Sequence, residues 1–175
     1  AGQKPSFRAA VRKRRCAIPA NGYYEWQKRL GPDGTPAKGT KDAPAKQPYF
    51  IHPPEQSRNI WFAGLYEWWQ DPQGAWILSC SILTAASPGP DSDDETLAGL
   101  AAIHDRTPVA MDRDALDAWL DPAAESKDEA QALIERVVAQ REDVAATWEL
   151  RPIGQAVGNV RNNSPELVEP VAALF

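Results

Sequence analysis

Sixteen prolines and eleven glycines are spread through this chain of 175 residues. Proline fixes its own φ and lacks an N–H, and glycine loses much conformational entropy on folding, so both interrupt long helices and strands. Their number predicts short elements joined by many loops and argues against a helix bundle. The length allows one domain with a real hydrophobic core and is short for two. We therefore expect a single domain over residues 1–175.

Apolar and alternating patterns predict seven strands, over residues 15–18, 22–27, 48–52, 60–69, 75–86, 107–111 and 147–153. The two strands 15–18 and 22–27 flank a turn at Pro19–Gly22. The stretch 75–86 is too apolar for a half-exposed strand, so we expect it at the centre of a sheet.

Helices are predicted over residues 4–14, over 112–119 with Asp112 as cap, and from the capping box of Ser126 and Glu129 to about residue 140. Together with the strands they indicate an α+β fold: a largely antiparallel, curved or barrel-like sheet with a few flanking helices. Residues 28–47 are rich in Gly, Pro, Lys and Asp, and we expect a mobile hairpin tip or an insertion there. Residues 87–100 read as a second polar loop.

Charge is distributed unevenly, because residues 1–30 contain eight lysines and arginines and one acid while the whole chain carries −5. Such a block is either a polyanion-binding face or a solvated helix face. Two cysteines and two histidines exclude a disulfide framework and a four-cysteine zinc site, and predict neither metal nor cofactor. With no apolar run of about 18 residues and no signal peptide, we expect a cytoplasmic protein without membrane contact.

Three polar positions stand out by their apolar surroundings. Glu25 lies between aromatic residues in YYEW, either as a surface residue of a strand or as a site acid. His104 and Arg106 interrupt the apolar run AIHDRTPVAM. Histidine titrates near pH 6.5 and suits proton transfer, and arginine binds phosphate in bidentate fashion; alternatively, Asp105 and Arg106 pair with each other in a strand-entry turn.

Two further groups have simpler explanations. Asn159, Asn162 and Asn163 in the tail AVGNVRNNSPEL either contact phosphate, together with a neighbouring arginine, or fix a loop, and the loop role is the more common one. Cys16 is either a nucleophile with His104 as its base or a buried, inert thiol.

Taken in order, five segments resemble the SRAP family (SOS response-associated peptidase domain), whose members act on abasic sites in single-stranded DNA. The segments are KPSFRAAVRKRRCAIPANGYYEW, FAGLYEWW, ILTAAS, IHDRTPVAM and VGNVRNNSPELVEP, and they extend from residue 4 to residue 170. Members of the family attach to the abasic sugar through an N-terminal cysteine, whose amine forms a Schiff base and whose thiol closes a thiazolidine ring.

The resemblance implies catalytic roles for Glu25 and His104 and DNA-phosphate contacts for Arg106 and Thr84. It also implies that this chain is the C-terminal part of a SRAP domain, because the family's N-terminal cysteine segment has no match in it. We therefore expect the chain to be inactive alone, to need that segment as a partner, and to be monomeric once complete.

Two alternatives remain open. A thiol (auto)peptidase, as the family's name suggests, would use the same acid and histidine. A nucleic-acid-binding module without chemistry would need only the phosphate contacts.

Overall fold

The computed structural model describes residues 5–40, 43–54, 58–89 and 91–175. The chain forms two compact units, each assembled from three separate segments. Unit 1 comprises Ala1–Ala20, Asn59–Ala86 and Arg106–Ala146, and unit 2 comprises Asn21–Arg58, Ser87–Asp105 and Thr147–Phe175. Each unit contains a three-stranded antiparallel sheet, which confirms the predicted α+β class with antiparallel pairing.

The sheet of unit 1 has β4 (Ile60–Gln70) between β1 (Arg15–Ala20) and β5 (Trp76–Ile82). The short strands β6 (Thr84–Ala86) and β7 (Arg106–Pro108) form a separate antiparallel pair. The helices of this unit are α1 (Pro5–Lys13), α3 (Arg113–Leu120), α4 (Lys127–Ala139) and α5 (Arg141–Ala145). Its core joins helices and sheet through buried side chains that include Val11, Ala63, Leu65, Val109, Trp119 and Val137.

Both helix caps predicted in unit 1 are confirmed. Asp112 caps α3, where its carboxylate accepts the Ala115 N–H at 2.7 Å. Ser126 and Glu129 form the capping box of α4, with reciprocal hydrogen bonds of 3.2 and 3.0 Å. Each cap satisfies helix N–H groups that have no partner within the helix, so the helix start is determined locally.

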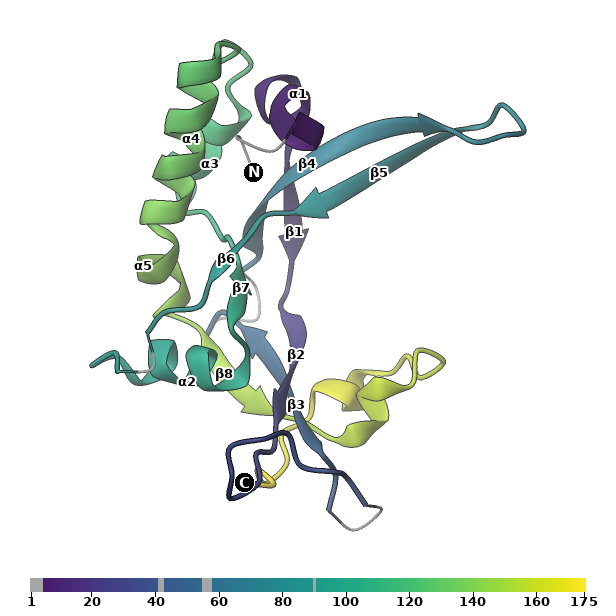
Figure 1. The fold of residues 1–175 in the computed structure, drawn as a ribbon, viewed down its shortest axis with the longest axis vertical. Coiled ribbons are helices and arrows are strands. Elements are labelled where there is room, and N and C mark those ends of the chain that lie inside the picture. The colour runs from purple at the N-terminus through teal and green to yellow at the C-terminus, as the bar shows by residue number, and fades with distance from the viewer. Residues whose placement is uncertain (1–4, 41–42, 55–57, 90) are drawn as a thin grey trace. The chain divides into compact units, whose positions relative to one another are not determined.

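The expected central position of residues 75–86 is wrong. The stretch divides into β5 and β6, and β5 is an edge strand of the sheet β1-β4-β5. Every residue of β5 is exposed, and Figure 1 shows β4 and β5 as a long two-stranded ribbon. Trp68 on β4 and Trp76 on β5 are 51% and 62% exposed. Apolar composition therefore did not determine burial here, because burial depends on what packs against a strand.

The sheet of unit 2 has β3 (Lys46–His52) between β2 (Tyr23–Lys28) and β8 (Glu149–Pro152). The predicted strands flanking Pro19–Gly22 therefore pair in different sheets and do not form a hairpin with each other. The C-terminal segment adds two 3₁₀ turns, η1 (Gln155–Gly158) and η2 (Pro165–Val168).

Unit 2 also contains a helix where a polar loop was expected. This helix, α2 (Glu95–Ile103), is capped by Asp94, whose carboxylate accepts the Leu97 N–H at 2.9 Å. Leu97, Leu100 and Ile103 are its buried residues. The acidic residues before the helix resemble a polar loop, so its short apolar face was not predicted.

Residues 29–45 connect β2 to β3, which pair as an antiparallel hairpin. Positions 41 and 42 of the expected mobile segment 28–47 lie outside the described residues, and its mobility stays a prediction. In the part of the chain that is described, no helix is both long enough and apolar enough to cross a bilayer.

Candidate functional site

Glu25 is a half-buried carboxylate in the middle of β2. Its Oε1 accepts the Trp26 N–H at 2.9 Å. Among the described residues no cation lies within ion-pair distance of it. Removing a carboxylate partly from water without giving it a cationic partner lowers the stability of the fold. The structure therefore does not support the explanation of Glu25 as a surface residue held in an ion pair, and it is compatible with a functional role.

Strand register places Glu25 on the face of the sheet that α2 covers. Tyr23, Ile51 and Leu150 are opposite one another across the three strands, so their side chains share one face. A Cβ at Gly99 of α2 would lie only 2.5 Å from Leu150 Cδ1, so α2 packs closely on this face. Glu25 follows Tyr23 by two residues and points the same way.

His104 is the C-cap residue of α2, and its side chain is 37% exposed. Its N–H donates to the Leu100 carbonyl at 3.1 Å, and its backbone is extended, with φ −155° and ψ 147°. The ring Nδ1 lies 3.2 Å from Asp105 Oδ1. The helix that ends at His104 therefore lies on the same side of the sheet as Glu25.

Ser87 holds the main chain at His104 by two hydrogen bonds. Its hydroxyl donates to the His104 carbonyl at 2.5 Å, and its N–H donates to the Asp105 carbonyl at 2.9 Å. No role was predicted for Ser87, and Asp105 was predicted only as a possible partner of Arg106. Asp105 adjoins the histidine in the chain and was a readable signal, whereas the contact with Ser87 spans 17 residues and depends on the fold.

Arg106 and Thr84 meet in unit 1, across the β6–β7 pair. The guanidinium Nε and Nη2 donate to Thr84 Oγ1 at 3.0 and 2.7 Å, and Nη2 also donates to the Thr84 carbonyl at 2.9 Å. Both residues are exposed. Within their own units Asp105 contacts His104 and Arg106 contacts Thr84, and the alternative in which Asp105 pairs with Arg106 stays a prediction. An exposed guanidinium held in a fixed orientation suits an oxyanion such as phosphate.

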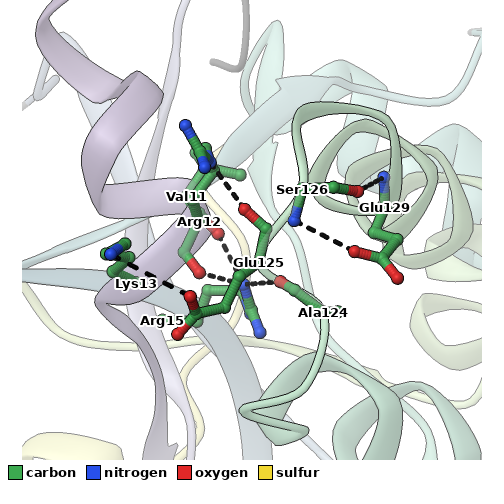
Figure 2. A network of polar contacts seen from close by, with 8 residues as sticks. All are labelled: Val11, Arg12, Lys13, Arg15, Ala124, Glu125, Ser126 and Glu129. Atoms are coloured by element: carbon green, nitrogen blue, oxygen red, sulfur yellow. Dashed lines mark hydrogen bonds and ion pairs between the residues drawn. The ribbon is translucent and has the colours of Figure 1, made fainter.

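Much of the N-terminal basic block has acceptors within unit 1 (Figure 2). Arg12 donates to the Glu125 carbonyl at 2.6 Å, and Arg14 forms an ion pair with Glu67 at 2.6 Å. Arg15 donates to five main-chain carbonyls, those of Val11, Arg12, Trp119, Asp121 and Ala124. These contacts weaken the polyanion-face explanation of the block and give its arginines a structural role.

Two other groups have pKa values displaced by their surroundings. Burial raises the pKa of the Tyr23 phenol strongly, and the nearby Glu25 charge adds to the effect. Tyr23 also packs edge-on against Trp148 at 5.9 Å. Burial raises the pKa of the Cys16 thiol, with a further contribution from Cys80. A thiol that resists ionisation is a poor nucleophile, so the structure favours the inert-thiol explanation of Cys16.

The asparagines of the tail hold their own loop. Asn159 Oδ1 accepts the Arg161 N–H at 3.1 Å, and Asn162 Nδ2 donates to the Ala156 carbonyl at 2.8 Å. These contacts agree with the structural explanation. Across the residues described, no three His, Cys, Asp or Glu side chains gather closely enough to hold a metal ion.

Comparison with known proteins gives a consistent result. The family model of the SOS response associated peptidase (SRAP) matches residues 1–160. The chain is 35% identical over 168 residues to the abasic site processing protein YoqW of Bacillus subtilis, covering 95% of this chain and 62% of YoqW. It is 29% identical over 197 residues to the rat abasic site processing protein HMCES, covering 98% of this chain and 48% of HMCES.

Solved structures with the same fold are also found. A crystal structure of a Bacteroides thetaiotaomicron protein matches 97% of this chain and 62% of its own, with a TM-score of 0.64 and 24% identity. A Bordetella bronchiseptica protein matches 88% of this chain and 62% of its own, with a TM-score of 0.54 and 20% identity. The chain thus spans less than two thirds of the length of each of these four proteins.

Proposed function

We propose, starting from the fact that this chain belongs to the SOS response associated peptidase (SRAP) family, that it takes part in processing abasic sites in single-stranded DNA. The proteins it resembles are named for abasic site processing, and YoqW is 35% identical to it. In this proposal the nucleophile is the N-terminal cysteine of the family, outside residues 1–175. Its amine and thiol form the thiazolidine link, and this chain supplies the acid–base and phosphate-binding groups.

His104 acts on the sugar as general acid–base. An abasic sugar is mostly a closed hemiacetal, and an amine attacks only the open aldehyde. Opening the ring requires a proton to leave the C1 hydroxyl and another to reach the ring oxygen, which a near-neutral imidazole can perform. A guanidinium cannot do this, because it stays protonated.

Glu25 manages the protons of the attacking amine in the same site as His104. Schiff-base formation needs a neutral amine at first and an acid later, when water is expelled. The observation that carries the proposal is the half-buried Glu25 carboxylate without a cationic partner among the described residues, on the sheet face covered by α2, the helix that ends at His104. An incoming ammonium would provide the missing partner.

Arg106, oriented by Thr84, binds a backbone phosphate. The contact is charge-assisted and exposed, so it contributes to affinity and to salt dependence more than to chemistry. The peptidase alternative gains no support from Cys16, whose raised pKa disfavours the thiolate.

The experiment is a binding titration of residues 1–175 on a single-stranded oligonucleotide at several salt concentrations. Arg106→Ala should weaken binding and reduce the slope of log K against log salt by about 0.7, the value for one phosphate contact on a single strand. Arg113→Ala is the matched control, because the Arg113 side chain is 82% exposed and, among the described residues, its ion pair is with Asp117 one turn away in α3. Equal slopes for wild type and Arg106→Ala would remove Arg106 from the interface.

A further inference from the structure

We propose that Asp105 and Ser87 are positioning residues for His104: they hold its imidazole in the tautomer that carries the proton on Nδ1. The arrangement is seen in unit 2 alone. Its chemical consequence, that Nε2 exchanges protons with the substrate, rests on the proposed function. Neither residue contacts the reacting atoms in this proposal, and both act through the histidine.

The side-chain half of the arrangement is the Asp105 carboxylate beside Nδ1. The two atoms are 3.2 Å apart, within hydrogen-bond distance, and an ionised carboxylate can only accept. Nδ1 must therefore carry the proton when the two atoms are bonded.

The main-chain half is the pair of hydrogen bonds from Ser87. The Asp105 side chain is 89% exposed, and a contact between so exposed a carboxylate and the imidazole ring contributes little free energy by itself. Ser87 changes this balance, because it fixes the carbonyls of both His104 and Asp105, at 2.5 and 2.9 Å. With both peptide groups held, less conformational entropy is lost when the two side chains meet. A third hydrogen bond, from the His104 N–H to the Leu100 carbonyl, holds the His104 main chain to the end of α2.

The consequence is a directional base. With the proton on Nδ1, the lone pair of a neutral imidazole lies on Nε2. Nε2 takes the proton of the C1 hydroxyl as the C1–ring oxygen bond breaks, and the electron pair of that bond goes to the ring oxygen. The ring oxygen then receives the proton from Nε2, so the imidazole returns neutral and the aldehyde is open.

The test is a ¹⁵N-edited NMR spectrum of the histidine rings of residues 1–175 above pH 8, which reports the tautomer without any activity. The chain has only two histidines, and His104→Gln assigns the signals. We expect His104 to be protonated on Nδ1 in wild type and to shift toward the Nε2–H tautomer in Asp105→Ala. Asp93→Ala, which removes another exposed acid of unit 2, should leave it unchanged. His52 is an internal control, since its Nδ1 lies 2.7 Å from the Pro53 carbonyl.

Ser87→Ala should shift the tautomer in the same direction, and Ser87→Thr, which keeps the hydroxyl, should restore it. An Nε2–H tautomer in wild type, or the same tautomer in wild type and Asp105→Ala, overturns the inference. A crosslinking assay with residues 1–175 joined to an N-terminal segment that begins with cysteine separates this from the proposed function. Asp105→Ala should slow crosslinking about tenfold, a part of the ~10²–10⁴-fold that general acid–base catalysis supplies, with DNA binding unchanged. If His104→Ala crosslinks normally, the proposed function fails while the tautomer result stands.

Discussion

Removal of the Arg15 guanidinium should destabilise unit 1 more than the loss of any single surface ion pair. The side chain donates to five carbonyls at 2.5–3.0 Å, and its guanidinium carbon lies 5.9 Å from the centre of the Trp119 ring. Burial lowers the pKa of Arg15, and the acids Asp121 and Glu125 oppose this shift, which agrees with a guanidinium partly withdrawn from water. The carbonyls belong to the end of α1, to the last turn of α3 and to the segment that follows α3, so the contact joins two helices to β1.

The magnitude follows from which acceptors water can reach. Three of the five hydrogen bonds are part-buried, and each carbonyl that loses its donor costs about 1 kcal/mol. The two exposed carbonyls find water at little cost. Arg15→Ala should therefore lose about 3 kcal/mol, and Arg15→Lys about half of that, because a lysine keeps the charge without the fork of donors.

The assay is thermal unfolding followed by far-ultraviolet circular dichroism. A loss of about 3 kcal/mol lowers Tm by roughly 6–12 °C in a chain of this size. Arg113→Ala again serves as control, because its exposed pair with Asp117 contributes only about 0.3–0.5 kcal/mol. If Arg15→Ala and Arg113→Ala have the same Tm, the carbonyl contacts of Arg15 do not stabilise the fold. The explanation of the basic block as a polyanion-binding face would then be favoured again.

Three further perturbations test other parts of the structure. Burial raises the pKa of Tyr23, so just above pH 10 only the unfolded chain ionises this phenol, and the free energy of unfolding falls by up to about 1.4 kcal/mol per pH unit. Tyr23→Phe should abolish that part of the loss, measured by urea titrations at pH 9 and pH 11. The same loss in Tyr23→Phe and wild type would contradict this prediction. Iodoacetamide at pH 8 should label the exposed Cys80 about tenfold faster than Cys16, as read by peptide mass spectrometry, and equal rates would show that the Cys16 thiol is not hindered. Gly99→Val should cost about 1–3 kcal/mol by overpacking against Leu150, and Leu150→Ala should relieve part of that cost; additive effects of the two changes would exclude the contact.

Local signals in the sequence predicted local structure. The caps at Asp112 and Ser126 were readable, because a cap depends on residues within one turn. The short helix α2 was missed, although Asp94 and the spacing of its buried leucines were present, because a long acidic lead-in resembles a loop. The position of β5 at a sheet edge could not be read, since an apolar strand looks the same whether or not another element covers it.

The candidate site divides in the same way. Glu25 and His104 stood out in the sequence because each is an isolated titratable group in an apolar run. That Glu25 and the helix ending at His104 lie on one side of a sheet follows from strand register and from the packing of α2, which only the fold reveals. The contacts of Arg15 and Ser87 are to main-chain carbonyls, and such contacts leave no pattern in side-chain chemistry.

The central claim is that Glu25 and His104 serve abasic-site chemistry. Its most direct test joins residues 1–175 to an N-terminal segment that begins with cysteine, as the proposal requires, and follows crosslinking to an abasic oligonucleotide on a denaturing gel, beside an undamaged strand. We expect a covalent product with the abasic strand only. His104→Ala should slow its formation by at most about 10²–10⁴-fold, and Glu25→Gln should alter both its formation and its reversal. Binding to the undamaged strand should change little in both variants. A product that forms at the wild-type rate in both variants, or equally with undamaged DNA, would contradict the claim.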